Sequence, residues 1–181
     1  MKYLTPLLVI SLLGCSSPQQ SSYYQLPAVT GQQQEVKQAA HYLFVEQVQV
    51  ANYLNGNGIV LQLSDVELSV ARQHLWADAL DKQLQRQLIN RLELLLPDYQ
   101  VGNLAQPGAY RVQVQVERFH GLPDGKAVIS GRYNLPQLQQ QYPFYFEIAL
   151  AEKGYSGLVN ALGQGWQKLA EQIAASIDTT S

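Results

Sequence analysis

The chain has 181 residues, of which 46% are hydrophobic and only 14% are charged, and its formal net charge is −2. This apolar content can fill a core, while the charged fraction is well below the ~25% usual for soluble domains. A net negative chain lacks the basic face that nucleic acid requires, so no nucleic-acid partner is expected.

Residues 1–14 have the composition of an export signal. Lys2 precedes an apolar run from Leu4 to Leu13, which is shorter than the roughly 20 residues that cross a bilayer as a helix. A positive start and a short apolar run are typical of a secretory signal peptide. The run ends in Leu-Leu-Gly-Cys, at the single cysteine of the chain, Cys15.

The Leu-Leu-Gly-Cys stretch resembles the lipobox of bacterial lipoproteins. This resemblance implies cleavage before Cys15, a diacylglycerol group on its thiol and an acyl chain on the freed amine. Ser16 follows in place of Asp, which in enterobacterial lipoproteins favours the outer membrane. The alternative is a buried cysteine in an ordinary N-terminal element. In the lipoprotein interpretation, residues 15–22 are the lipidated cysteine and a flexible tether, and residues 23–181 are one globular periplasmic domain.

Residues 23–70 are expected to form short strands. Residues 23–26 form a strand stopped by Pro27, and residues 28–38 a polar loop. Residues 41–50 are expected to be one strand whose apolar face carries Tyr42, Phe44, Val48 and Val50. The Asn-Gly-Asn-Gly sequence at 55–58 predicts a turn, because both residue types tolerate positive φ. Two strands are expected after it, at 59–63 and 66–70.

Two amphipathic helices are expected. Over residues 75–96 an apolar stripe recurs every four residues, at Trp76, Leu80, Leu84, Leu88 and Leu92, which is the period of a helix with one buried face. The carboxylates of Asp78 and Asp81 are expected near the start of this helix, where the positive end of its dipole stabilises them, and Pro97 ends the helix. A second helix is expected at about 156–177, weakened by two glycines. Its stripe is Val159, Leu162, Trp166, Leu169, Ile173 and Ile177.

Three strands with alternating apolar and polar side chains are expected between the helices. They lie at 110–119, around 127–133 and at 144–150, and a turn at 121–125 joins the first two as an antiparallel hairpin. The predicted fold class is α/β (α+β), a single domain in which a mixed, largely antiparallel sheet is packed by two long amphipathic helices. The strand at 66–70, the first helix and a strand after Pro97 are candidates for one βαβ crossover.

No catalytic or metal-binding constellation emerges, so neither an enzyme nor a cofactor is expected. His41, His74 and His120 are isolated in the sequence, and His74 and His120 are expected at the surface. Gly154-Tyr155-Ser156-Gly157 lacks the last glycine of a nucleophile elbow, and residues 121–127 are one residue short of a phosphate loop. Trp76 and Trp166 are expected in the core, with a face for a hydrophobic partner as the alternative.

Five segments in register resemble the PqiC family, the ABC-type transport auxiliary lipoproteins of the paraquat-inducible Pqi system. They are the Tyr-Tyr-Gln-Leu-Pro sequence that follows the lipobox, and residues 45–65, 75–80, 116–133 and 154–174. The resemblance covers nearly the whole chain. Ala79 departs from it, since relatives often carry Pro there.

The resemblance implies a non-catalytic docking subunit on the periplasmic face of the outer membrane. Its partner would be an MCE-domain (PqiB-like) tunnel protein, and the system would move lipid between the membranes and support envelope integrity. A homo-oligomeric ring would match a symmetric tunnel. Only Cys15 is carried over as a functional residue, and the partner-binding residues are unknown. The alternatives are a lipoprotein that carries lipid itself, an outer-membrane assembly factor and an enzyme.

Overall fold

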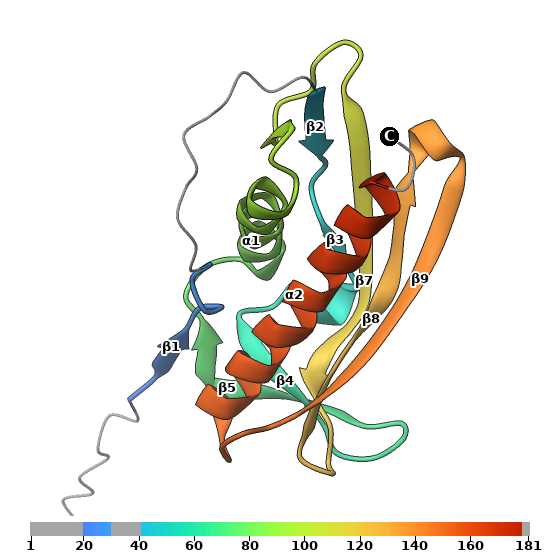
Figure 1. The fold of residues 1–181 in the computed structure, drawn as a ribbon. Helices are drawn as coiled ribbons and strands as arrows, with labels where there is room; N and C mark the ends of the chain where they lie inside the picture. Colours follow the sequence, from blue (N-terminus) through green and yellow to red (C-terminus); the bar gives the residue numbers. More distant parts are fainter. Residues whose placement is uncertain (1–19, 30–40, 179–181) are drawn as a thin grey trace, which may run out of the picture.

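A computed structural model describes residues 20–29 and 41–178 of the chain. In this part, nine strands form one sheet and two α-helices pack on it (Figure 1). The strands are β1 (Ser22–Tyr24), β2 (His41–Val45), β3 (Gln49–Val50), β4 (Gly58–Gln62), β5 (Leu68–Trp76), β6 (Tyr99–Gly102), β7 (Tyr110–Gly121), β8 (Lys126–Leu135) and β9 (Gln140–Ala149). The helices are α1 (Leu80–Leu95) and α2 (Tyr155–Asp178), with 3-10 turns η1 (Asn52–Leu54) and η2 (Pro136–Leu138).

The long strand β7 organises the sheet. One of its edges pairs in parallel with β2, β3 and β4 in turn, and its other edge pairs antiparallel with β8, which continues to β9. On the far side, β6 joins β2 in parallel, β5 joins β4 antiparallel, and β1 joins β5 in parallel. The mixed sheet is therefore confirmed, and parallel pairs are more numerous than expected.

The predicted βαβ crossover is wrong. Strands β5 and β6 flank helix α1 in the sequence, but β4, β7 and β2 separate them in the sheet. Strand β5 also runs antiparallel to β4, whereas β4, β7, β2 and β6 share one direction. The connection through α1 therefore carries the chain across the sheet to an oppositely directed strand.

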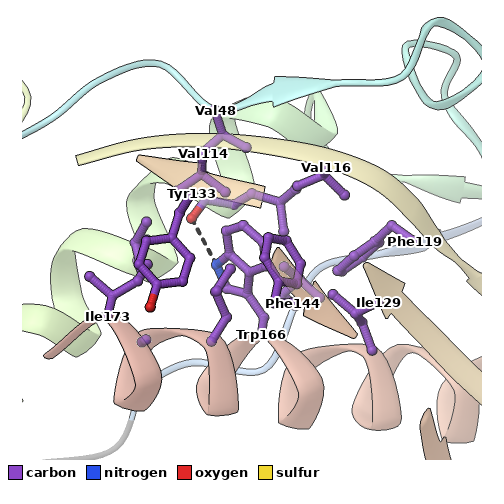
Figure 2. Packing of buried hydrophobic residues seen from close by; sticks show 14 of the residues in the cluster. Val48, Val114, Val116, Phe119, Ile129, Tyr133, Phe144, Trp166 and Ile173 are labelled. Carbon is purple, nitrogen blue, oxygen red and sulfur yellow. Dashed lines mark hydrogen bonds between the residues drawn. The ribbon is translucent and has the colours of Figure 1, made fainter. Parts of the chain in front are cut away.

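Both helices cover the same face of the sheet (Figure 1). Helix α2 crosses β7, β8 and β9, while α1 lies over β2 and β6 and contacts α2. The apolar stripe predicted for the second helix is confirmed, since all six of its residues are buried. Figure 2 shows Trp166 at the centre of the core between α2 and the sheet, with Val114, Phe144 and Ile129 around it. The indole Nε1 of Trp166 donates to the Leu84 carbonyl of α1 at 3.0 Å.

The first helix begins later than its stripe predicts. Helix α1 starts at Leu80, and the expected helical residues Leu75 and Trp76 belong to β5. Hydrogen bonds to two neighbours hold this end of β5 extended: the Trp76 N–H donates to the Asn57 carbonyl, and the Ala77 N–H to the Tyr24 carbonyl. Pairing with β4 and β1 therefore overrides the helical period.

The expected strand over residues 41–50 is broken into β2 and β3. Its predicted apolar face is also wrong in the first half, because Leu43 and Val45 are fully buried while Tyr42 and Phe44 are only half-buried. Val48 is buried, as predicted. In β2 the odd-numbered residues Leu43 and Val45 face the core. The break between β2 and β3 shifts this alternation, so that the even-numbered Val48 faces the core.

Two glycines allow close approach inside the core. A Cβ on Gly131 of β8 would overlap the Gln115 carbonyl of β7, and a Cβ on Gly165 of α2 would overlap the side chain of Ile129. The glycine at 165 thus lets the helix settle directly on the sheet. Its low helix propensity is the cost of this contact.

The two long edges of the sheet differ. The Leu150 N–H donates to the Gly125 carbonyl, so even-numbered residues of β9 direct their N–H groups to β8 and odd-numbered ones direct them outward. Pro143 stands at an outward position, where it removes a donor from the free edge. On the opposite side, β5 pairs with β1 only at residues 74–76 among the described residues.

Candidate functional site

The predicted lipidation residue Cys15 lies outside the described residues. The first element of the described residues is β1, which joins the edge of the sheet beside β5, with Ser22 opposite His74. No helix within residues 20–29 and 41–178 is long and apolar enough to cross a membrane. The signal peptide, the tether boundaries and the loop expected at 28–38 likewise remain predictions over most of their length.

His74 links the N-terminal strand to the second helix. It lies on β5 and is half-buried, so its predicted surface position is only partly correct. Its Nδ1 and the Tyr24 hydroxyl are 2.9 Å apart, and its ring stacks on Tyr155 of α2 with centroids 3.8 Å apart. Burial raises the pKa of Tyr155. This cluster fastens β1, the strand nearest Cys15, to the rest of the domain.

His120 is only 2% exposed, so its predicted surface position is wrong. It follows Phe119, which packs on Trp166, and therefore faces the side of the sheet away from α2. There it lies near the ring of Tyr53 from η1, and its Nδ1 is 3.3 Å from the Gly121 carbonyl. Burial lowers the pKa of His120, which favours a neutral core imidazole.

Asp78 and Asp81 have local structural roles. Asp81 lies in the first turn of α1, as predicted. Asp78 precedes the helix, accepts from the Ala79 N–H at 2.8 Å and binds the Arg86 guanidinium at 3.0 Å. These two donors lower the pKa of Asp78. The two carboxylates stabilise the helix start and have separate partners.

The two weak catalytic motifs lie where elements join, at the 121–125 turn and at the start of α2. Lys126, at the end of the 121–125 turn, is held by Asp124 at 2.8 Å and Glu147 at 3.0 Å, so its charge is already matched. Ser156 is an exposed residue in the first turn of α2, and the following Leu158 is buried. Among the described residues, no group of three His, Cys, Asp or Glu side chains could hold a metal ion.

A cavity of about 340 Å³ lies where α1, α2 and the chain after β1 meet. Leu26, Pro27, Trp166 and the alanines at positions 28, 151 and 161 form its apolar part. Polar side chains supply much of the rest, namely Gln87, Arg91, Glu152, Asn160, Gln164 and Gln167. An acyl chain requires an apolar lining, so this cavity suits a polar group or a peptide side chain better than a lipid tail.

The hairpin between β4 and β5 carries the most exposed apolar cluster. We call residues 63–70 the hairpin tip. Val66 is 96% exposed, Leu63 52%, Val70 50% and Leu68 42%. The Leu63 N–H donates to the Glu67 carbonyl at 2.8 Å, which closes the turn. The sequence predicts strands on both sides of this turn, but it does not mark the four apolar residues as exposed.

Comparison with known proteins gives the class of the molecule. Residues 24–174 match the family model of the ABC-type transport auxiliary lipoprotein component. The chain belongs to this family of auxiliary lipoproteins.

More particularly, the chain is similar to the intermembrane transport lipoprotein PqiC of Escherichia coli K12 and to the protein of the same name from Shigella flexneri. It is 38% identical to each over 181 residues, which cover 97% of both chains. The resemblance to the PqiC family is thereby confirmed.

Solved structures agree on the fold. A crystal structure of an uncharacterised protein, 38% identical, superposes with a TM-score of 0.77 over 87% of this chain and 99% of the other. A Xanthomonas campestris protein, 15% identical, superposes with a TM-score of 0.67 over 88% of this chain and all of the other. At that identity the second likeness concerns the fold alone.

Proposed function

We propose that this chain is the lipid-anchored, non-catalytic docking subunit of an MCE-type intermembrane lipid transport system that supports envelope integrity. Acyl groups on Cys15 hold it at the periplasmic face of the outer membrane, where it receives the outer end of a PqiB-like tunnel. The observation that carries the proposal is the likeness to PqiC, which extends over 97% of both chains.

The side chains of the domain are consistent with docking rather than catalysis. His74 and His120 are engaged in aromatic contacts, and Lys126 and Asp78 are bound by opposite charges. The mixed polar and apolar lining of the 340 Å³ cavity suits a peptide side chain better than a lipid tail, which supports docking over the lipid-carrier alternative. Several copies in a ring would match a symmetric tunnel, since closed symmetry satisfies every subunit contact.

Photo-crosslinking in intact cells tests the partner. Gln164 beside the cavity and Tyr145 on the face of the sheet away from α2 are exposed and make a matched pair. Gln85 is less suitable, because its amide donates to the Val45 carbonyl. Adducts with an MCE-domain protein at one of the two faces, with self-adducts beside them, are expected. Capture of a β-barrel or of free lipid, with no MCE protein over a wider exposed panel, would overturn the docking role.

The anchor has a separate test. Cys15→Ser should move the protein from the membrane fraction to the periplasmic fraction, while the wild-type mature chain should carry the mass of three acyl chains. An unmodified cysteine in the wild-type mature chain would contradict the anchor. Native mass spectrometry of the unlipidated domain addresses the carrier alternative, which near-equal co-purified phospholipid would support.

A further inference from the structure

The hairpin tip is an apolar surface without a cover in the described residues. Its four apolar side chains lie within eight positions of the chain, and Val66 at the apex is 96% exposed. Single exposed apolar residues are ordinary on a protein surface, whereas a cluster marks a contact with another protein or with lipid.

The first strand of the domain pairs with the strand that leads away from this tip. Strands β1 and β5 are parallel, with Ser22 opposite His74. Residues 20 and 21 therefore lie on the side of Ser22 that corresponds to the earlier residues of β5. In Figure 1, β1 lies at the lower left of the molecule and the β4–β5 turn at its lower right.

The tether length brings the tip within reach of the anchoring membrane. Ser22 is seven positions after Cys15, and this segment spans at most about 25 Å when fully extended. Val66 is eight positions before His74, which is at most about 27 Å of extended chain, and less here because the pairing of β5 with β4 shifts register between Val70 and Leu75. Both lengths are upper limits of similar size, so a membrane within reach of Cys15 can also meet the hairpin tip.

We propose that the hairpin tip contacts the lipid surface in which the acyl chains of Cys15 are embedded. The inference rests on the lipid anchor of the proposed function and adds a second, protein-made contact to it. One contact leaves the domain free to rotate on its tether. Two contacts fix which end of the domain faces the lipid. The other end, where β7 begins at Tyr110, is then directed into the periplasm.

Charge and backbone limit the depth of this contact. Asp65 and Glu67 flank Val66, and their carboxylates repel anionic headgroups. The contact therefore depends on the apolar side chains, and anionic lipid weakens it. Beyond the turn, β5 has no partner on one side at residues 68–73 of the described chain, and unpaired backbone groups are costly in hydrocarbon. Only the apex around Leu63 and Val66 therefore enters the acyl region, and Leu68 and Val70 remain at the headgroups.

Tryptophan fluorescence of the lipidated protein in phosphatidylcholine vesicles tests the contact. Both native tryptophans are buried and give a constant background. In one variant Val66→Trp places the probe at the tip. The matched control is Leu104→Trp, because Leu104 is 71% exposed and lies in the connection before β7. Strand β7 spans about 36 Å from that connection to Gly121, which pairs with Leu61 beside the hairpin.

The expected result is a blue-shifted emission for Val66→Trp. Brominated phosphatidylcholine should quench it at least about threefold more than the control, since a shallow insertion reaches the acyl boundary. Raising the fraction of phosphatidylglycerol should reduce this quenching. Equal quenching of the two variants would overturn the inference. A blue shift without quenching by lipid would also overturn it and would assign the tip to contact with a second copy or another protein.

Co-sedimentation with the vesicles separates the two failures. If neither variant sediments with lipid, the anchor itself is missing and the proposed function fails. If both sediment and the tip probe is not quenched, the anchor stands and only the hairpin contact fails. Leu63→Ser in the Val66→Trp variant gives a further check, because it should sediment fully and yet weaken the quenching of the tip probe.

Discussion

The core beneath α2 and the hairpin tip use the same sequence pattern with opposite outcomes. In β7, Val112, Val114 and Val116 alternate with polar residues and are at most 3% exposed. In β5, Leu68 and Val70 alternate in the same way and are 42% and 50% exposed. Alternation specifies a strand with one apolar face, but it does not specify whether the chain supplies a cover for that face.

The cover is what differs between the two regions. Helix α2 lies across β7, β8 and β9 and places Trp166 among their side chains (Figure 2). Over the hairpin tip the described residues provide no such element. The apolar face of β7 therefore stabilises the fold, whereas that of the hairpin tip is available for a contact outside the chain.

The largest expected effect is in the covered region. Trp166→Ala should lower the free energy of unfolding by about 3–5 kcal/mol, because it removes a large buried side chain and leaves a cavity. Val66→Ala, its control at the tip, should change the free energy by less than about 0.5 kcal/mol. Urea unfolding followed by far-UV circular dichroism measures both. Similar losses in the two variants would refute the contrast.

Close packing around the glycines sharpens the comparison. Gly131→Ala should cost about 1–3 kcal/mol, since the added methyl group forces β7 and β8 apart at the Gln115 carbonyl. Gly56, in the turn before β4, has open space where a methyl group would stand, with no neighbouring atom within 4 Å. Gly56→Ala should therefore be neutral or stabilising by up to about 1 kcal/mol. Thermal unfolding of the pair is the measurement, and a neutral Gly131→Ala would contradict the close approach.

His120 allows a test of a covered site on the other face of the sheet. Burial lowers its pKa below the value of 6.5 that it has when unfolded. Between the lowered pKa of the folded state and 6.5, the unfolded chain binds more protons than the folded one. The contribution of neutral His120 to the free energy of unfolding is therefore fully present above about pH 6.5 and is lost as the pH is lowered. His120→Gln should flatten this part of the stability curve. Parallel curves for the two proteins would show that another group causes the decline.

The smallest effect is expected at the tip. Leu68→Thr/Val70→Thr keeps the β propensity of β5 and should leave the free energy of unfolding within about 0.5 kcal/mol of the wild type. The matched variant Val114→Thr on β7 should be clearly destabilised, because its hydroxyl would be buried. A loss of more than about 2 kcal/mol at the tip would mean that another part of the chain covers these side chains.

Patterns confined to one element were predicted correctly from the sequence. The stripe of α2, the alternation of β7 and the turn at 121–125 each depend on neighbours within a few residues, and the structure contains all three. The buried positions of Trp76 and Trp166 were also predicted correctly, although Trp76 reaches the core from a strand instead of a helix.

Features that depend on distant partners were predicted incorrectly. Residues 75 and 76 fit the stripe of α1, yet strand pairing with segments around Tyr24 and Asn57 keeps them extended. His120 has the sequence context of a surface turn and is buried near η1, which lies far earlier in the chain. The hairpin tip could have been found from its apolar residues around Asp65, but only the structure reveals that they are exposed.

The position of α2 after all nine strands of the described chain has a consequence for the order of folding. The face formed by β7, β8 and β9 lacks its main cover until residues 155–178 are available, and the stacking of His74 on Tyr155 also depends on them. A chain that emerges from its N-terminus therefore exposes the sheet-forming segments before it can bury them. Completion of the core waits for residues 155–178, which form the last helix of the described chain.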